Sequence, residues 1–260
     1  MFHVIFFKGG HIHNYIIVLY LPTYQSVHMP KDMIKAKKVH KYYEGGVRVH
    51  ALRGLDLSIE EGEMVAIMGP SGCGKTTLLN CLSSLDDISS GNVWIGGKDL
   101  NSLSDNKKTE MRALSMGFVF QFYNLLPVLT AVENVELPLL LAGRSNGAKK
   151  KAQKALDMVG LSHRYDHRPS ALSGGERQRV TIARAIVNEP DIIWADEPTG
   201  DLDTKSSDKI MDILCKLNKK NGHTMVIVTH EDRVAERACR IINMESGRIK
   251  DDISNGDCGR

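Results

Sequence analysis

Short apolar runs alternate with amphipathic segments over most of the chain. Four runs are apolar throughout, which is typical of strands buried on both faces of a parallel sheet; they cover residues 64–68, 118–120, 192–195 and 225–228. Segments 34–39, 55–59 and 93–95 alternate only in part and indicate half-buried strands. Residues 77–85 and 209–217 place their apolar side chains on one helical face. This order of strands and helices predicts an α/β fold.

Each of the four apolar runs is followed by a glycine or a polar residue with useful chemistry. Gly69, Gln121, Asp196 with Glu197, and His230 stand at or just beyond these ends. Ligands of open parallel sheets bind in the crevice outside the carboxyl ends of the strands. We therefore expect these side chains, from four separate segments, to gather at one edge of the sheet.

The composition is that of a globular protein. Of 260 residues, 42% are hydrophobic and 25% are charged, and no apolar run approaches the ~18 residues that a membrane helix needs. We therefore expect neither a channel nor a complete transporter. The net charge of +3 is too small to indicate a nucleic-acid partner without a local basic patch. The five cysteines form no CxxC pair and their number is odd, which predicts reduced thiols.

Residues 1–32 differ from the rest of the chain. Their longest apolar stretch has seven residues and no small-residue cleavage site follows it, which argues against a signal peptide and a membrane helix. Met29 and Met33 both come just before the first strand pattern. The preferred hypothesis is that the natural start is one of these two residues, and that residues 1–32 are a non-native or disordered extension.

Residues 69–76 match the pattern GxxxxGK[ST] between an apolar run and an amphipathic helix, the context that a phosphate-binding loop requires. The glycines let several backbone N–H groups turn toward a triphosphate, and the helix start adds partial positive charge. Lys75 can reach the β- and γ-phosphates, and the Thr76 hydroxyl can ligate Mg²⁺. The predicted nucleotide-binding residues here are Gly69, Pro70, Ser71, Gly72, Cys73, Gly74, Lys75, Thr76 and Thr77.

Two adjacent acids follow the apolar run at 192–195. Asp196 stands where a phosphate-loop enzyme needs a carboxylate to hold Mg²⁺. Glu197 can polarise an attacking water as a general base. His230, after the next run, could contact the γ-phosphate and orient that water, or it could be a structural histidine. We favour the functional role.

Residues 172–179 read LSGGERQR. Ser173 and Glu176 form a capping box, which predicts a helix start, and Gly174 and Gly175 make that start a second anion-binding platform. One chain then carries two phosphate-binding surfaces, and a single triphosphate does not need both from one chain. We therefore predict a two-fold dimer, with ATP between the Lys75 loop of one copy and the Ser173 loop of the other.

These motifs together resemble the ATP-binding subunits of ATP-binding cassette (ABC) transporters, over about residues 33–250. The family order is kept: phosphate loop, Gln121, LSGGE at 172–176, the acids at 196–197, a D-loop at 200–203 and His230. The D-loop begins Gly-Asp where many relatives carry Ser-Ala. By this resemblance Tyr43 would stack on adenine, with neighbouring Tyr42 as the alternative, and Gln121 would touch Mg²⁺ and sense the γ-phosphate.

The resemblance assigns roles to the candidate residues. The catalytic set would be Glu197, His230 and Gln121, and the Mg²⁺ ligands would be Thr76, Gln121 and Asp196. ATP would contact the phosphate loop and Tyr43 in one copy. In the other copy it would contact Ser173, Gly174, Gly175 and Glu176.

The resemblance also implies a fold and partners. The fold would be a P-loop NTPase (RecA-like) core with an antiparallel β subdomain, an inserted α-helical subdomain at about 122–178, and a flexible tail at 251–260. Segments 118–140 and 196–200 resemble the lipoprotein-release and macrolide-export branch, which includes the cell-division ATPase. Members pair with an integral membrane permease, whose coupling helix docks beside Gln121, at the cytoplasmic face of the cell membrane. Apolar side chains suited to such a groove, or to an ordinary core, are Phe122, Tyr123, Leu125 and Leu126.

The expected function is an ATP-hydrolysing subunit that powers a membrane transporter through dimer closure. One alternative is an ABC ATPase that acts as a mechanical switch on a membrane partner, as in cell division. Soluble ABC proteins of DNA repair or of the ribosome usually carry two cassettes, a coiled coil or zinc motifs, which this sequence lacks. A phosphate-loop kinase or GTPase is disfavoured by the LSGGE sequence and by the missing NKxD guanine motif.

Overall fold

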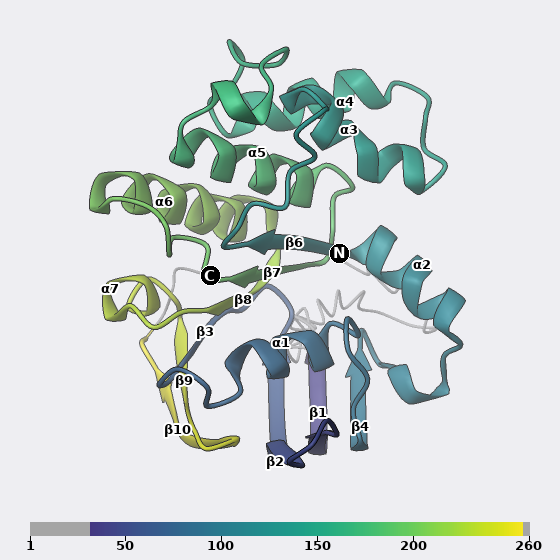
Figure 1. The fold of residues 1–260 in the computed structure, drawn as a ribbon, viewed down its shortest axis with the longest axis vertical. Coiled ribbons are helices and arrows are strands. Elements are labelled where there is room, and N and C mark those ends of the chain that lie inside the picture. The colour runs from purple at the N-terminus through teal and green to yellow at the C-terminus, as the bar shows by residue number, and fades with distance from the viewer. Residues whose placement is uncertain (1–31, 257–260) are drawn as a thin grey trace, which may run out of the picture. The chain divides into compact units, whose positions relative to one another are not determined.

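The computed structural model describes residues 32–256 (Figure 1). The proposed extension at 1–32 therefore lies outside the described residues, apart from Asp32. Met33, one of the two candidate starts, lies inside the first strand.

Two sheets organise the fold. A four-stranded antiparallel sheet has the order β2-β1-β4-β5. Its strands are β1 (Asp32–Tyr43), β2 (Val49–Glu60), β4 (Ser90–Ile95) and β5 (Lys98–Asp99). A six-stranded sheet has the order β10-β9-β3-β8-β7-β6. Its strands are β3 (Met64–Met68), β6 (Met116–Phe120), β7 (Ile192–Asp196), β8 (Thr224–Val228), β9 (Arg240–Glu245) and β10 (Arg248–Ser254).

The four apolar runs lie in four adjacent parallel strands of the six-stranded sheet, as predicted. β3 and β7 both pair with β8, and β6 pairs with β7, all in parallel. Within β7, Ile193 and Ala195 enter one hydrophobic core, whereas Ile192 and Trp194 enter the other. The four runs are apolar throughout because each face of the sheet is covered by its own core.

Helices cover the two faces unequally (Figure 1). α1 (Lys75–Leu82) packs with β1, β2 and β4 against one face. The other face carries α3 (Ala131–Leu141), α4 (Ala148–Met158), α5 (Gly174–Ile186) and α6 (Thr204–Asn221). The remaining helices are α2 (Asp105–Ser115), α7 (Asp232–Ala235) and the 3₁₀ turns η1 (Leu100–Ser102) and η2 (Pro169–Ala171). α1 and α5 therefore lie on opposite sides of the sheet.

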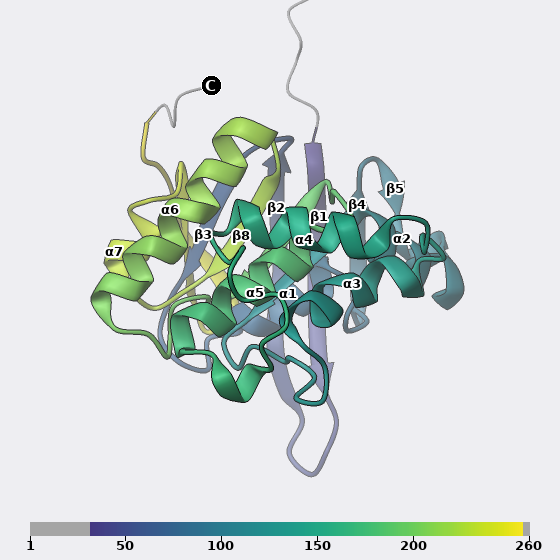
Figure 2. The same cartoon turned by 90° about the horizontal axis from the view of Figure 1, so that it is seen from above.

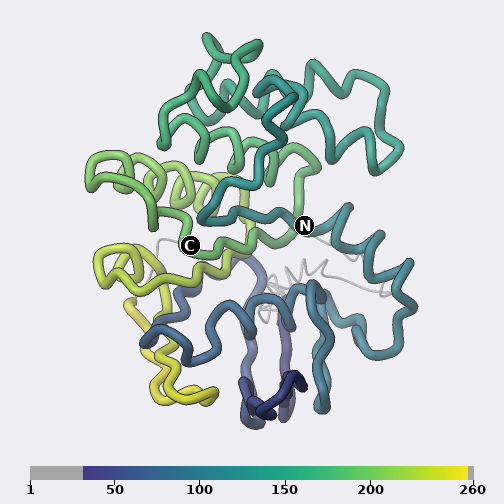
Figure 3. Tube along the Cα trace, in the orientation of Figure 1, coloured from purple at the N-terminus to yellow at the C-terminus, as the bar shows by residue number. Residues whose placement is uncertain are grey.

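The helices α3 and α4 are inserted between β6 and α5. The trace leaves the sheet after β6, passes through these helices and returns along α5 to β7 (Figure 3). From above, α3, α4 and α5 lie together (Figure 2), and they contact one another. This arrangement agrees with an inserted helical subdomain, whose limits at about 122–178 stay a prediction.

Several predicted boundaries differ from the observed ones. The helix predicted at 77–85 ends at Leu82, and Ser84 beyond it takes a φ of 59°, which leaves the helical region. The predicted flexible tail at 251–260 is wrong for 251–254, because β10 pairs with β9 up to Ser254. Alternation in β10 is too weak to reveal a strand, since nearly all its residues are exposed.

The cysteine prediction is partly wrong. Cys73, Cys81 and Cys215 are free thiols, whereas Cys239 is disulfide-bonded. An odd number of cysteines rules out complete pairing but does not exclude a disulfide bond. Among the described helices, none has the length and apolar character required to cross a membrane.

Candidate nucleotide-binding site

The phosphate loop connects the end of β3 to the start of α1. Gly69 has a φ of 145°, and a Cβ there would lie 2.2 Å from the carbonyl oxygen of Met244. At Gly74, with a φ of 105°, a Cβ would lie 2.9 Å from the carbonyl oxygen of Ala51. Only glycine fits these two positions, since they combine a left-handed backbone with close neighbouring backbone.

Lys75 is folded into its own loop. Its Nζ donates to the carbonyl oxygens of Gly69, at 2.7 Å, and Pro70, at 3.1 Å, and the residue is only 8% exposed. No side chain caps the start of α1, so the first N–H groups of this helix have no side-chain partner. The loop thus offers an ammonium group and a helix start to the same anion.

A cavity of about 550 Å³ opens beside this loop. From the predicted set it is lined by Tyr43, Ser71, Gly72, Gly74, Lys75, Thr76, Thr77 and Glu197. Sequence reasoning missed the rest of its lining, namely Val49, His50, Ala51, Arg53, Ser246 and Gly247. These residues come from β2 and from the turn between β9 and β10, and no motif marks them. In the sequence, the pair Ser246-Gly247 indicates only a turn.

Of the two candidate tyrosines, Tyr43 lines the cavity. Tyr42 instead stacks on His50, with ring centroids 4.1 Å apart, and the Arg48 guanidinium lies 4.1 Å from the Tyr42 ring centroid. Both tyrosines belong to β1, where successive side chains point to opposite faces. The geometry favours Tyr43 as the residue that meets a ligand.

Thr76 and Asp196 meet across the sheet edge. The Thr76 hydroxyl donates to Oδ1 of Asp196 at 3.1 Å. Burial raises the pKa of Asp196, as does the neighbouring charge of Glu197, while the Thr76 hydrogen bond and Lys75 act in the opposite direction. A hydroxyl and a partly buried carboxylate form an oxygen donor pair of the kind that Mg²⁺ prefers.

Glu197 and His230 are in direct contact. Nδ1 of His230 lies 3.0 Å from both carboxylate oxygens of Glu197. The Glu197 backbone takes a φ of 48°, in the left-handed region, and its N–H donates to the carbonyl of Val228 at 2.9 Å. This strained turn, tied to the end of β8, aims the carboxylate into the cavity.

Gln121 is engaged elsewhere in the described structure. Its Nε2 donates to Oδ1 of Asp201 at 3.3 Å, and a Cβ on Gly200 would lie 3.0 Å from that same nitrogen. Glycine at position 200 leaves room for this contact. Gln121 does not line the cavity, so its role as a Mg²⁺ ligand stays a prediction.

The LSGGE segment begins α5 as predicted. The Glu176 N–H donates to the Ser173 hydroxyl at 3.3 Å, and the Ser173 N–H donates to the Glu176 carboxylate at 2.9 Å. Arg164 holds the same carboxylate at 2.9 Å. None of residues 173–176 lines the cavity beside Lys75 in the same chain. The two predicted anion-binding surfaces are therefore apart within one chain.

Comparison with known proteins decides the family. The family model described as ABC transporter matches residues 52–200, more than half of the chain. The chain belongs to the ABC transporter family. The predicted α/β P-loop NTPase fold and the ABC ATPase function are thereby confirmed.

Several relatives match this ABC protein along most of their length. The ABC transporter ATP-binding protein MJ1508 of Methanocaldococcus jannaschii is 49% identical over 224 residues, which cover 85% of this chain and all of that protein. The lipoprotein-releasing system ATP-binding protein LolD of Legionella pneumophila is 46% identical over 84% of this chain and 96% of its own. The cassette MJ0796, solved as a dimer bound to ADP and Pi, aligns with a TM-score of 0.81 at 44% identity, covering 86% of this chain and 100% of that one.

Proposed function

We propose that this ABC ATPase hydrolyses ATP between two copies of itself and passes the resulting motion to a membrane permease. The observation that carries the proposal is the placement of α1 and α5 on opposite faces of the sheet. The Ser173 cap does not line the cavity beside the Lys75 loop, so one triphosphate in that cavity would not meet both within a chain. A two-fold head-to-tail pair would bring each loop opposite the other copy's cap, and a relative is known as a dimer with ADP and Pi.

The residues beside the cavity fit the chemistry of hydrolysis. Lys75 would leave the carbonyls of Gly69 and Pro70 and bind the phosphates. Glu197 would take a proton from the attacking water, and His230 would hold that carboxylate in place. Thr76 and Asp196 would hold Mg²⁺, which when bound neutralises charge on the phosphates.

A second, apolar cavity of about 450 Å³ supports the permease as partner. Its lining comes from the loop after α1 and from α2, β6, α3 and α5, and it includes Leu85, Phe118, Phe120, Leu137, Pro138 and Leu141. Leu141 is 78% exposed and Leu85 is 45% exposed. Exposed apolar surface of this kind marks a contact site. We propose that a coupling helix of the permease occupies it, at the cytoplasmic face of the membrane.

The four apolar residues expected beside Gln121 divide between two environments. Phe122 and Leu126 are exposed, whereas Leu125 packs against the core of the helical layer. Tyr123 is half-buried, and the Arg177 guanidinium lies 5.0 Å from its ring centroid. Phe122 and Leu126 are therefore the two that suit a docking surface.

The decisive experiment measures the mass of the Glu197→Gln variant in solution by light scattering, with and without ATP. Glutamine keeps the size of the side chain but cannot take the proton, so ATP binds and persists. We expect the mass to double on addition of ATP. The same variant with Ser173→Arg, which places bulk and charge at the opposing cap, should stay monomeric while it still binds ATP. Doubling in both variants would refute the composite site.

A further inference from the structure

The hydroxyl end of Tyr43 is held by a carboxylate from a distant segment. Tyr43 Oη donates to Oδ2 of Asp86 at 2.8 Å. Asp86 lies in the loop that follows α1, between Leu82 and Ser90. The bond therefore joins the last residue of β1 to the far end of the helix that begins in the phosphate loop.

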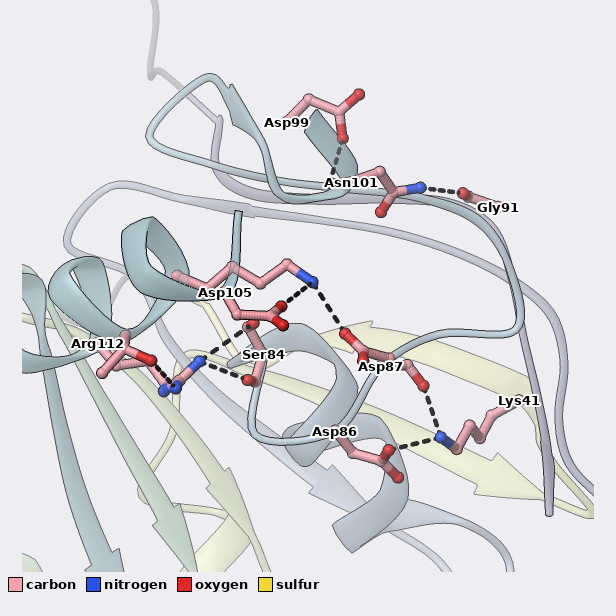
Figure 4. Close-up of polar contacts among 11 residues, drawn as sticks. Lys41, Ser84, Asp86, Asp87, Gly91, Asp99, Asn101, Asp105 and Arg112 are labelled. Atoms are coloured by element: carbon pink, nitrogen blue, oxygen red, sulfur yellow. Dashed lines mark hydrogen bonds and ion pairs between the residues drawn. The ribbon is translucent and has the colours of Figure 1, made fainter. Parts of the chain in front are cut away.

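Asp86 is itself held by a buried cation. Its Oδ1 accepts from Nζ of Lys41 at 2.6 Å, and the same ammonium donates to the carbonyl oxygen of Asp87 at 2.6 Å (Figure 4). Lys41 is only 8% exposed, and its Nζ lies 4.9 Å from the centroid of the Tyr43 ring. One hydrogen bond from Lys41 thus holds the carboxylate that accepts from the tyrosine hydroxyl, and a second holds the backbone of the next residue.

Besides Asp86, the side chain of Thr77 also hydrogen-bonds to the Tyr43 side chain, and the chain around the ring gives it little further support. β1 ends at Tyr43, and residues 44–49 after it are all exposed. Tyr43 is itself 40% exposed and lines the cavity together with Lys75. A free ring at a strand end loses rotamer freedom when a ligand stacks on it, and this loss weakens binding. Anchoring the hydroxyl removes that loss before the ligand arrives.

We propose that Asp86 is a positioning residue that presents the Tyr43 ring to the base of the bound nucleotide. The inference rests on the proposed function, since it requires that the cavity bind ATP. Asp86 does not line the cavity beside Lys75 and would act through the tyrosine hydroxyl. The structure thereby separates two parts of the site: the loop that binds the triphosphate, and the Lys41–Asp86–Tyr43 chain that orients the base.

The ionisation of Asp86 agrees with this role. Burial alone would raise the pKa of Asp86, but the hydrogen bonds from Lys41 and Tyr43 outweigh it and hold that pKa below its ordinary value. Asp86 is therefore a charged acceptor at neutral pH. Burial and the hydrogen bond to Asp86 raise the pKa of Tyr43, so its hydroxyl keeps the proton that it donates.

The test compares two ligands, ATP and inorganic triphosphate, which shares the phosphates but has no base. Asp86→Ala removes the acceptor and should weaken ATP binding about 3- to 10-fold, the range for one lost hydrogen bond. Affinity for inorganic triphosphate should not change. In steady-state hydrolysis KM for ATP should rise with kcat unchanged. Asp86→Asn keeps an oxygen acceptor and should recover most of the affinity.

Tyr43→Phe is the matched partner, because it removes the hydroxyl and keeps the ring. It should weaken ATP binding about as much as Asp86→Ala, and the double variant should lose no more than either single one. Tyr42→Phe is the control and should have no effect, since that ring stacks on His50. Should Asp86→Ala unfold the protein because the Lys41 charge loses its carboxylate partner, Tyr43→Phe and Asp86→Asn still test the inference.

Three results would overturn the inference. They are unchanged ATP affinity in Tyr43→Phe, additive losses in the double variant, and an equal loss of inorganic triphosphate binding in Asp86→Ala, which would mean a merely structural role. Failure of the proposed function gives a different pattern. In that case neither ligand binds the unaltered protein, or Lys75→Ala binds inorganic triphosphate as well as the unaltered protein does.

Discussion

The hydroxyl of Thr76 donates a 3.1 Å hydrogen bond to the carboxylate of Asp196, although 120 positions separate the two residues. Thr76 follows β3 and Asp196 ends β7, and both strands pair in parallel with β8. The contact therefore depends on the order of strands in the sheet. It joins the phosphate loop to the acids that we propose act on water and metal.

Asp196→Asn should abolish most ATP hydrolysis and stabilise the nucleotide-free fold. The amide keeps the Thr76 contact but loses the charge that would hold Mg²⁺, so we expect the hydrolysis rate to fall by about 10- to 100-fold. Because burial raises the pKa of Asp196, its ionised form is less favourable in the folded protein than in the unfolded chain. Thermal unfolding without nucleotide should show a higher Tm for the variant at pH 7.5.

The pH dependence supplies the control for this prediction. When the pH lies above the raised pKa of Asp196 in the folded protein, this carboxyl is ionised in both the folded and the unfolded state, and it lowers the free energy of unfolding. Below the ordinary aspartate pKa it is protonated in both states and that cost vanishes. The Tm advantage of Asp196→Asn should therefore shrink as the pH falls toward 3.5. An advantage that grew in acid would contradict the sign of the shift.

Lys75→Ala should remove tight ATP binding. Hydrogen bonds from a charged donor to the phosphates correspond to a loss of about 10- to 100-fold in affinity, measurable by calorimetry. Lys209→Ala, which removes an exposed lysine on α6, changes the net charge equally and should bind ATP normally. Equal affinities in the two variants would refute the phosphate-loop assignment.

Ser173→Ala should separate the capping role of Ser173 from its role in the dimer. Losing the cap of α5 should cost about 1 kcal/mol of stability, and ATP binding to the monomer should be unchanged. In a protein that keeps Glu197, the rate of ATP hydrolysis should fall, since the cap of the opposing copy no longer offers its hydroxyl. Thr130→Ala is the matched control, because Thr130 and Glu133 form the same capping box on α3. It should lose similar stability in urea unfolding and keep full hydrolysis.

His230→Ala should lower kcat by about 100-fold with little change in KM, because His230 contacts Glu197, the general base that we propose, and would not hold the nucleotide. Rates at saturating and limiting ATP would separate the two constants. His223→Ala serves as a comparison, since Nδ1 of His223 lies 2.6 Å from the carbonyl oxygen of Pro190 and not beside Glu197. A raised KM with native kcat in His230→Ala would instead place the histidine at the phosphates.

Local patterns predicted the parts of the site that depend on neighbouring residues. The LSGGE capping box was readable because both its bonds join residues three positions apart. The glycines at 69 and 74 were readable because the loop pattern itself requires them. The burial of Lys41 could not be read from the sequence. An alternating strand does not indicate that Asp86, 45 positions later, will pair with the Lys41 ammonium.

The missed cavity residues show the same limit. Arg53 and Gly247 reach the phosphate loop from β2 and from the β9–β10 turn, where the Arg53 N–H donates to the Gly247 carbonyl at 2.9 Å. No sequence pattern in either segment predicts contact with a ligand. Their place depends on how the antiparallel sheet meets the parallel one, which is a matter of long-range packing.

The sequence by itself determined the family, the α/β class, the phosphate loop and the order of its motifs, because these rest on residue types at short spacings. Only the tertiary structure decided that Tyr43 and not Tyr42 lines the cavity, that Gln121 pairs with Asp201, and that α1 and α5 pack on opposite faces of one sheet. Those relationships join segments far apart in the chain, and strand pairing and core packing set them.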